Sequence, residues 1–100
     1  MNNEKDFQRA RNKQNFLEMI QRTGEKISDR LSDVLPNPER DFHKGQEVMF
    51  TNEYGVTFGA FEILGFSENP QQFYGRCVYL DKDSYWFPVR PSELTLVSEQ

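Results

Sequence analysis

The sequence predicts an α+β protein, in which a helical N-terminal third precedes five short antiparallel strands. Apolar residues at helical spacing occur only before Pro36 and Pro38, which cannot continue a helix. After Gly45 the pattern changes to short runs of β-branched and aromatic residues that are separated by turn residues. Eleven of the fourteen aromatic residues fall between positions 50 and 87, so we expect the core in the second half.

The helical part is predicted from an apolar stripe with steps of three and four residues. Gly24 interrupts this stripe at a cost of about 1 kcal/mol relative to alanine, so we expect two helical segments that meet at Thr23–Gly24. The stripe consists of Phe16, Ile20, Thr23, Ile27, Leu31 and Val34, and Leu17 and Leu35 widen it.

The β-module is predicted from alternating apolar residues and turn residues. Gly59 lies in the middle of the long second strand, where it indicates a bulge or a sharp bend. A single helical turn is expected at residues 92–94, and tight turns at residues 52–55 and 81–84. The expected strands are residues 47–51, 56–66, 73–80, 85–87 and 95–97.

This order of elements resembles a small SH3-like barrel, in which a bent second strand serves both sheets. The resemblance rests on Gly45, Val48, the long second strand, the hairpin ending at residues 85–87 and residues 92–97. The turn at residues 52–55 and the segment 86–89 are also similar to small uncharacterised proteins of bacterial mobile elements, such as integron cassettes and plasmids. Neither resemblance implies functional residues.

The expected division is a helical segment over residues 1–35, a linker over 36–44 and an SH3-like barrel over 45–98. A chain of 100 residues buries only about two-thirds of its unfolded surface, so one structural domain is expected overall. The single cysteine excludes an internal disulfide. Polar residues follow Met1, and no stretch approaches the length of a membrane span. We therefore expect a cytoplasmic protein with no membrane contact.

Catalytic and metal chemistry have weak support in this sequence. Cys77 and His43 are the only candidate thiol and base, and Cys77 lies among residues expected in the core. Asp81 and Asp83 flank Lys82, where turn formation explains them better than a metal site does. The six glycines show no phosphate-loop spacing. We expect no enzyme, no metal, no cofactor and no small-molecule substrate.

The aromatic residues give the strongest functional signal, because eleven within 38 residues exceed what a small barrel encloses. Three coverings are open: the helical stripe of the same chain, a partner chain such as a second copy, or a peptide in a groove. The favoured function is a non-enzymatic binding or adaptor module. The residues predicted to accept Lys or Arg side chains are Tyr54, Tyr74, Tyr85, Trp86, Glu53, Asp81 and Asp83.

The alternative is a nucleic-acid-associated protein with a basic N-terminal arm. Acidic residues are interleaved with the basic ones, which favours a solvated helix of mixed charge. Residues 44–100 carry four Lys/Arg against eight Asp/Glu, and such an acidic module is a poor partner for phosphates. Nucleic acid is thus the less favoured partner. The arm would consist of Lys5, Arg9, Arg11 and Lys13.

Overall fold

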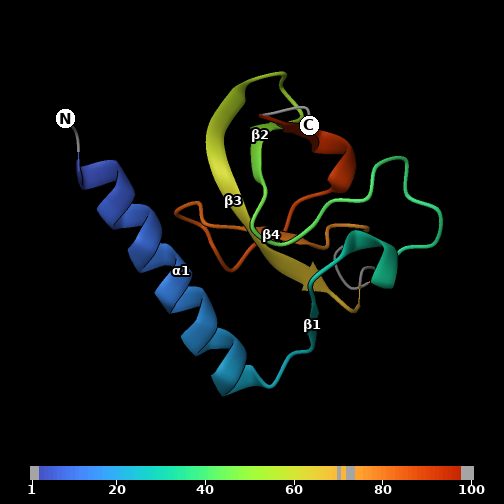
Figure 1. Ribbon diagram of the computed structural model, residues 1–100, viewed down its shortest axis with the longest axis horizontal. Coiled ribbons are helices and arrows are strands. Elements are labelled where there is room, and N and C mark those ends of the chain that lie inside the picture. The colour runs from blue at the N-terminus through green and yellow to red at the C-terminus, as the bar shows by residue number, and fades with distance from the viewer. Residues whose placement is uncertain (1–2, 70, 72–73, 98–100) are drawn as a thin grey trace.

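The computed structural model describes residues 3–69, 71 and 74–97, with side chains from residue 6 onward. One N-terminal helix, α1 (Asn3–Thr23), lies along one side of a five-stranded antiparallel sheet, so the chain is an α+β protein (Figure 1). In the described part of the chain, no helix combines the length and the apolar character that crossing a membrane requires.

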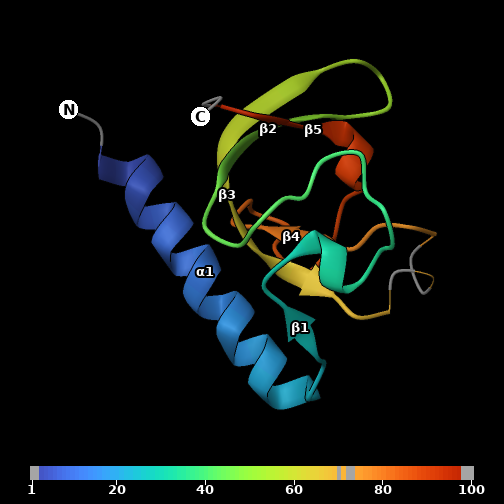
Figure 2. The ribbon, with the colours of Figure 1, turned by 45° about the vertical axis from the view of Figure 1, so that its right-hand side comes forward.

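The long strand β3 (Thr57–Ser67) organises the sheet. Its first half pairs with β2 (Glu47–Thr51), and its second half pairs with β1 (Ile27–Ser28) on one edge and β4 (Val78–Leu80) on the other (Figure 2). Strand β2 also pairs with β5 (Leu94–Leu96). All pairings are antiparallel, and the strand order β1-β3-β2-β5 does not close on itself among the described residues.

Two glycines let β3 change direction. The partner of β2 shifts from Phe61, opposite Val48, to Gly59, opposite Met49, which leaves one extra residue on β3. This confirms the bulge predicted at Gly59. A second register shift occurs before Gly65, whose φ is 155° and where an added Cβ would collide with the Ile27 side chain. Gly65 therefore permits β1 to lie close against β3.

The hydrophobic core has a main cluster inside the sheet and a smaller one under the helix. The smaller cluster consists of Phe16, Leu64 and Tyr79, and Met19 and Ile20 of α1 pack against it. The helical stripe thus covers part of the sheet of its own chain. The main cluster consists of Leu31, Phe42, Val48, Ile63, Phe66, Cys77, Val78, Leu80, Val89 and Leu94.

The C-terminal end of α1 is fixed by Glu25. The Tyr79 hydroxyl donates to both oxygens of the Glu25 carboxylate, at 3.0 and 3.2 Å, and the Ser67 hydroxyl donates to one of them at 3.0 Å. Burial and the neighbouring Glu25 charge raise the pKa of Tyr79. The helix is consequently attached to β3 and β4 by polar contacts as well as by apolar ones.

The predicted second helical segment is wrong. Gly24 has a φ of 73° and its N–H donates to the Ile20 carbonyl, which is the geometry of a helix C-terminus. The chain then enters β1 at Ile27 and forms a short 3-10 helix over Leu31–Asp33. The second half of the apolar stripe therefore packs in or against the core from β1, from the 3-10 helix and from the residues that follow it, and not from an α-helix.

The predicted strand at residues 85–87 is also wrong. Residues 81–87 form an irregular loop, because the Lys82 ammonium donates to the Ser84 carbonyl and hydroxyl and to the Phe87 carbonyl. The chain returns at Val89, which forms an isolated bridge with Val78.

The other expected strands agree with the structure more closely. The strand expected at residues 47–51 is confirmed, and the one expected at 56–66 is displaced by one residue. The third expected strand, residues 73–80, is shorter: its described part is the three residues of β4, and residue 73 lies outside the described residues. The turn expected at 92–94 is a 3-10 helix over Pro91–Glu93, followed directly by β5.

Candidate functional site

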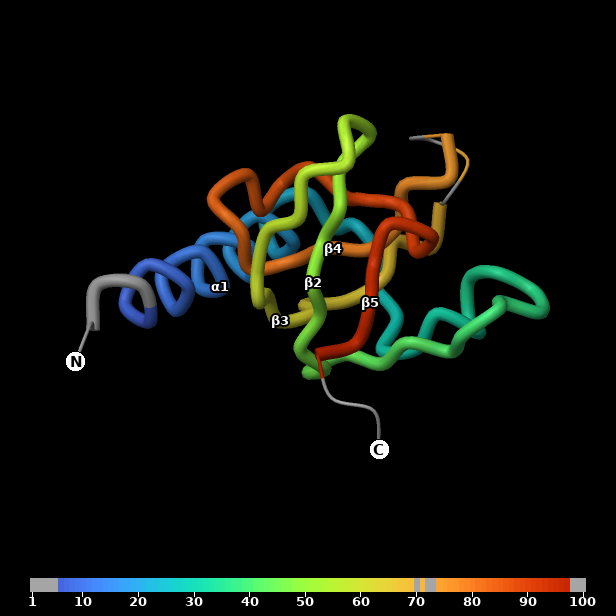
Figure 3. Tube along the Cα trace, turned by 90° about the horizontal axis from the view of Figure 1, so that it is seen from above, coloured from blue at the N-terminus to red at the C-terminus, as the bar shows by residue number. Residues whose placement is uncertain are grey.

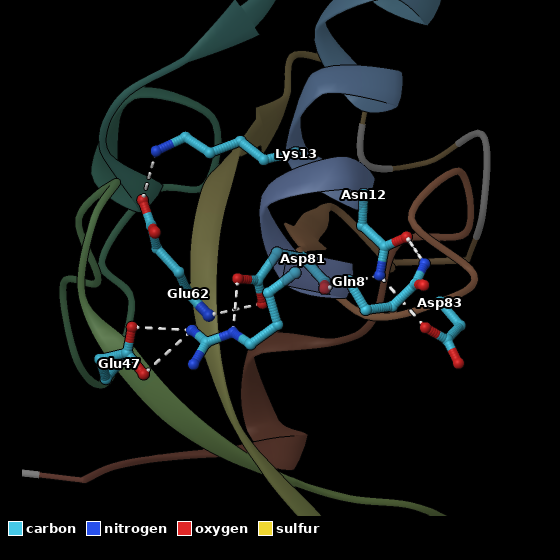
Figure 4. A network of polar contacts seen from close by, with 8 residues as sticks. Gln8, Asn12, Lys13, Glu47, Glu62, Asp81 and Asp83 are labelled. Atoms are coloured by element: carbon cyan, nitrogen blue, oxygen red, sulfur yellow. Dashed lines mark hydrogen bonds and ion pairs between the residues drawn. The ribbon is translucent and has the colours of Figure 1, made fainter. Parts of the chain in front are cut away.

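The N-terminal half of α1 is joined to the sheet by a network of ion pairs (Figure 4). Arg9 Nε donates to Asp81 Oδ2 at 2.8 Å, and Arg9 Nη2 donates to the Glu47 carboxylate at 2.9 and 3.2 Å. One helical turn later, Lys13 Nζ lies 3.1 Å from Glu62 Oε2. Two cations on one face of α1 therefore meet carboxylates from β2, β3 and the residue after β4.

Asp81 is the buried centre of this network, with 3% of its side chain exposed. Its Oδ1 accepts the Glu62 N–H at 2.9 Å, so both carboxylate oxygens have a partner. The pKa of Asp81 is raised overall, mainly because the carboxylate is buried. The hydrogen bond from the Glu62 N–H and the contact with Arg9 lower this pKa, but by less than burial raises it. Burial alone would lower the pKa of Arg9, but the hydrogen bonds and charges of Asp81 and Glu47 raise it overall. We expect an ionised pair at neutral pH.

Asn12 fixes the loop after β4 against the helix. It is almost fully buried, and its Nδ2 donates to the Asp81 carbonyl at 3.1 Å and to Asp83 Oδ1 at 3.2 Å. Its Oδ1 accepts a hydrogen bond from Gln8 Nε2 at 3.0 Å. The amide therefore uses both its donor and its acceptor atoms, which favours one orientation of the loop.

A groove of about 580 Å³ lies between α1 and the hairpin of β2 and β3, and residues of this network form part of its wall. Met49, Phe58 and Phe61 form an apolar wall, and Phe58 is 46% exposed. The Phe58 ring stacks on Phe50 with centroids 6.3 Å apart, which holds it at the edge of the hairpin. The other walls are formed by Asp6, Gln8, Arg9, Asn12, Asp81, Lys82 and Asp83.

The groove is acidic on balance. A hollow of about 350 Å³ adjoins it at Arg9, Asp6 and Asp81, and adds Lys13, Glu47 and Glu62 to its surroundings. The described residues around the groove and this hollow therefore include five carboxylates and three cations. The carboxylates are Asp6, Glu47, Glu62, Asp81 and Asp83, and the cations are Arg9, Lys13 and Lys82.

Lys82 holds the loop that forms one end of the groove. Its ammonium donates to two carbonyls and one hydroxyl within 2.9 Å and lies 5.8 Å from the centroid of the Phe87 ring. Burial lowers the pKa of Lys82 to about 8. The ammonium of Lys82 therefore bonds within its own loop. Arg76 also lies over the Phe87 ring, at 5.7 Å from the centroid.

The structure distributes the predicted aromatic site over three loops (Figure 3). Tyr54, with Glu53, lies in the turn between β2 and β3, Tyr74 precedes β4, and Tyr85 and Trp86 follow β4. Tyr85 and Trp86 contact each other edge to face, with centroids 5.1 Å apart, and Tyr85 also packs against the cluster under α1. Tyr74 instead adjoins Arg90, whose Nε donates to its carbonyl at 3.3 Å.

The prediction that aromatic surface remains outside the core is confirmed. Tyr54 and Tyr74 are each more than 80% exposed and Trp86 is 56% exposed. The predicted carboxylates Asp81 and Asp83 lie in the network beneath the groove, where Arg9 and Asn12 bind them.

The same network includes some of the residues of the predicted nucleic-acid arm but not others. Arg9 and Lys13 point toward the sheet and are paired with carboxylates, whereas Arg11 is exposed. The side chain of Lys5 lies outside the described part of the structure. Two of the four expected cations are thus already neutralised by the protein itself.

The candidate thiol and base have separate surroundings. Cys77 is fully buried in the main core, where burial raises its pKa to about 11. His43 Nε2 lies 3.7 Å from Asp41 Oδ2. A buried thiol with a raised pKa is a poor nucleophile. Among the described side chains, no group of three or more His, Cys, Asp or Glu residues is arranged to hold a metal ion.

The sequence reasoning missed Gln8, Asn12, Glu47, Glu62 and Phe58. A signal for the helix residues was present, because Gln8, Asn12, Phe16 and Ile20 follow one another at steps of four. The apolar stripe thus continues into polar residues on the same helical face. Such a continuation indicates a buried polar contact, but its partners on the strands cannot be found from spacing alone.

Comparisons with protein-family models, with curated proteins and with solved structures give no match. The resemblance to mobile-element proteins stays a prediction, and the site is interpreted from its own geometry.

Proposed function

We propose that this protein is a non-enzymatic binding module that holds a cationic segment of a partner protein in the groove between α1 and the β2–β3 hairpin. The observation that carries the proposal is the combination of a half-exposed aromatic ring, Phe58, with an excess of carboxylates around one groove. This combination suits a Lys or Arg side chain, which has an apolar stem and a charged end.

The arrangement of charge indicates where the charged end and the apolar stem of the bound side chain would lie. Asp81 is already bound by Arg9, whereas Asp6 and Asp83 are exposed on two sides of the groove. An incoming ammonium or guanidinium would therefore contact Asp6 and Asp83, with its stem against Met49 and Phe58. Side chains of this kind gain from both contacts, since their stem is apolar and their end is charged.

Trp86 extends the proposed surface beyond the groove. It lies on the same loop as Lys82 and Asp83, which line the groove, and it is 56% exposed. An exposed tryptophan beside a groove is a typical anchor for a partner chain. We expect residues that flank the bound cation to contact Trp86.

The scaffold in this proposal is an SH3-like barrel that is open at one side. Support comes from the long bent β3, which has β2 as a partner in its first half and β1 and β4 in its second half. The short 3-10 helix before β5 agrees with the same architecture.

The test uses short fluorescent peptides of equal length, one rich in arginine and one rich in glutamate, with fluorescence polarisation as the readout. We expect the arginine peptide alone to bind, and Phe58→Ser or Asp83→Asn to weaken it by about tenfold. Tyr74→Ser is the control, because Tyr74 is also aromatic and is more exposed than Phe58, at 81% against 46%, but lies on another loop. Circular dichroism confirms that each variant is folded.

Two results would refute the proposal. One is equal binding of the acidic and basic peptides, because an acidic groove discriminates between them. The other is binding that Phe58→Ser leaves unchanged in a folded protein. Titration with duplex DNA tests the alternative: binding that weakens steeply with salt would favour the basic arm, although Arg9 and Lys13 are paired.

A further inference from the structure

A second pocket, of about 480 Å³, lies between the segment that follows the first 3-10 helix and the start of β5. None of its described lining residues belongs to the groove beside α1. Its size is within the range of small-molecule sites, which is about 300–1,000 Å³. The apolar part of its wall consists of Leu31, Leu35, Pro38, Phe42, Pro91 and Leu94.

Three of the six described residues of the apolar wall belong to the main core. These are Leu31, Phe42 and Leu94, and the Leu31 N–H donates to the Phe42 carbonyl at 3.0 Å. The two segments that face each other across the pocket are therefore fixed by the core. A pocket of this kind is largely formed before a ligand arrives, which limits the entropy lost on binding.

Two arginines give the pocket a positive rim in a chain of net charge −4. Arg90 is positioned by its own backbone, since its N–H donates to Glu93 Oε1 at 3.1 Å, and by its Nε, which donates to the Tyr74 carbonyl. A guanidinium has five N–H donors, so the two terminal Nη groups of Arg90 can still bind an anion. Arg40 is the second cation, and Glu39 is the one carboxylate among the described lining residues.

We propose that this pocket binds a small amphipathic carboxylate, with its hydrocarbon chain against the apolar wall and its carboxylate at Arg90. Guanidinium groups match the geometry of a carboxylate and bind it through two parallel hydrogen bonds. An amine of the same length would meet the like charge of Arg90, and an alcohol would gain only the apolar contact. The site is independent of the peptide groove.

The probe is octanoate, measured by titration calorimetry and by chemical-shift changes in the folded protein. We expect octanoate to bind, and octylamine and octanol to bind about tenfold more weakly or less. Shortening the acid should weaken binding by about fourfold for each methylene group removed, as expected for burial of a hydrocarbon chain. Shifts should appear at Leu35, Phe42 and Leu94.

Arg90→Gln should weaken the binding of octanoate by about tenfold. The control Arg11→Gln removes an exposed cation of α1 and should leave the affinity for octanoate unchanged. Because Arg90 also supports the loop at Tyr74, Ser92→Trp is the second variant. It places a large ring at the rim from an exposed position and keeps both arginines.

The proposal is overturned if octanoate does not bind, if octylamine binds as tightly, or if Ser92→Trp leaves the affinity unchanged. Phe58→Ser separates this site from the proposed function, because it should weaken peptide binding by about tenfold without changing octanoate binding. Loss of both activities in Ser92→Trp would show that the two surfaces are not independent and would likewise contradict the assignment.

Discussion

Asp81 is the residue on which the attachment of α1 to the sheet depends most. Its buried carboxylate is balanced by a guanidinium and an N–H, and a buried charge that loses its partner is strongly destabilising. Lys13 and Glu62 form the neighbouring ion pair, but 43% of the Lys13 side chain is exposed. Water already solvates that pair in part, so it contributes less.

Arg9→Met should therefore lower the free energy of unfolding by roughly 3 kcal/mol. This value is at the lower end of the range for breaking a buried ion pair, because 27% of the Arg9 side chain is exposed. The matched variant Lys13→Met should cost less than about 1 kcal/mol. Urea unfolding followed by circular dichroism measures both. Equal losses in the two variants would show that Asp81 is not effectively buried. Arg9→Met combined with Asp81→Asn should recover part of the loss.

At the scale of elements, the close contact between β1 and β3 depends on the absence of a side chain at Gly65. The Ile27 side chain occupies the space that a Cβ would need, and the φ of 155° is one that other residues rarely adopt. This contact directs the chain from the end of α1 back to the sheet. It also brings Glu25 within reach of Tyr79.

Gly65→Ala should lower the free energy of unfolding by about 2 kcal/mol, because backbone strain and a steric clash act together. Gly55→Ala is the control, since Gly55 also has a positive φ but has open space around it, and it should cost about 1 kcal/mol. Thermal unfolding compares the two. If Ile27→Ala does not relieve any of the Gly65→Ala loss, the clash is not its cause.

Element prediction from the sequence worked where local contacts decide the outcome. The strand at residues 47–51 and the bulge at Gly59 follow from alternation and from glycine conformation, which are properties of neighbouring residues. The strand expected at residues 85–87 failed for the opposite reason. Lys82 holds that loop through carbonyl contacts that no periodicity reports.

At the scale of the whole molecule, the main core extends from Leu31 to Leu94 and joins every strand except β1. Cys77 is a fully buried member of this core, and its N–H donates to the Val89 carbonyl. Its carbonyl accepts the Ser67 N–H, so the backbone at Cys77 is bonded to β3 on one side and to Val89 on the other. The reactivity of its thiol should consequently report opening of the entire core.

The native thiol should react with an aromatic disulfide reagent at least about a hundredfold more slowly than the unfolded chain at neutral pH. Its raised pKa, from 9.0 to about 11, accounts for that factor, and its burial slows the reaction further. Absorbance of the released thiolate measures both rates, with urea-unfolded protein as the reference. A native rate close to the unfolded one would contradict the burial of Cys77.

The sequence by itself determined that a helix precedes a sheet, that Phe16 and Ile20 face inward and that aromatic surface remains outside the core. These properties depend on periodicity and on the volume that a small sheet can enclose. Only the tertiary structure decided which charges are paired, because Arg9 and Asp81 are 72 residues apart. It also separated the aromatic residues onto three loops and placed Phe58 beside the acidic groove, since contacts between distant segments are set by how the elements pack.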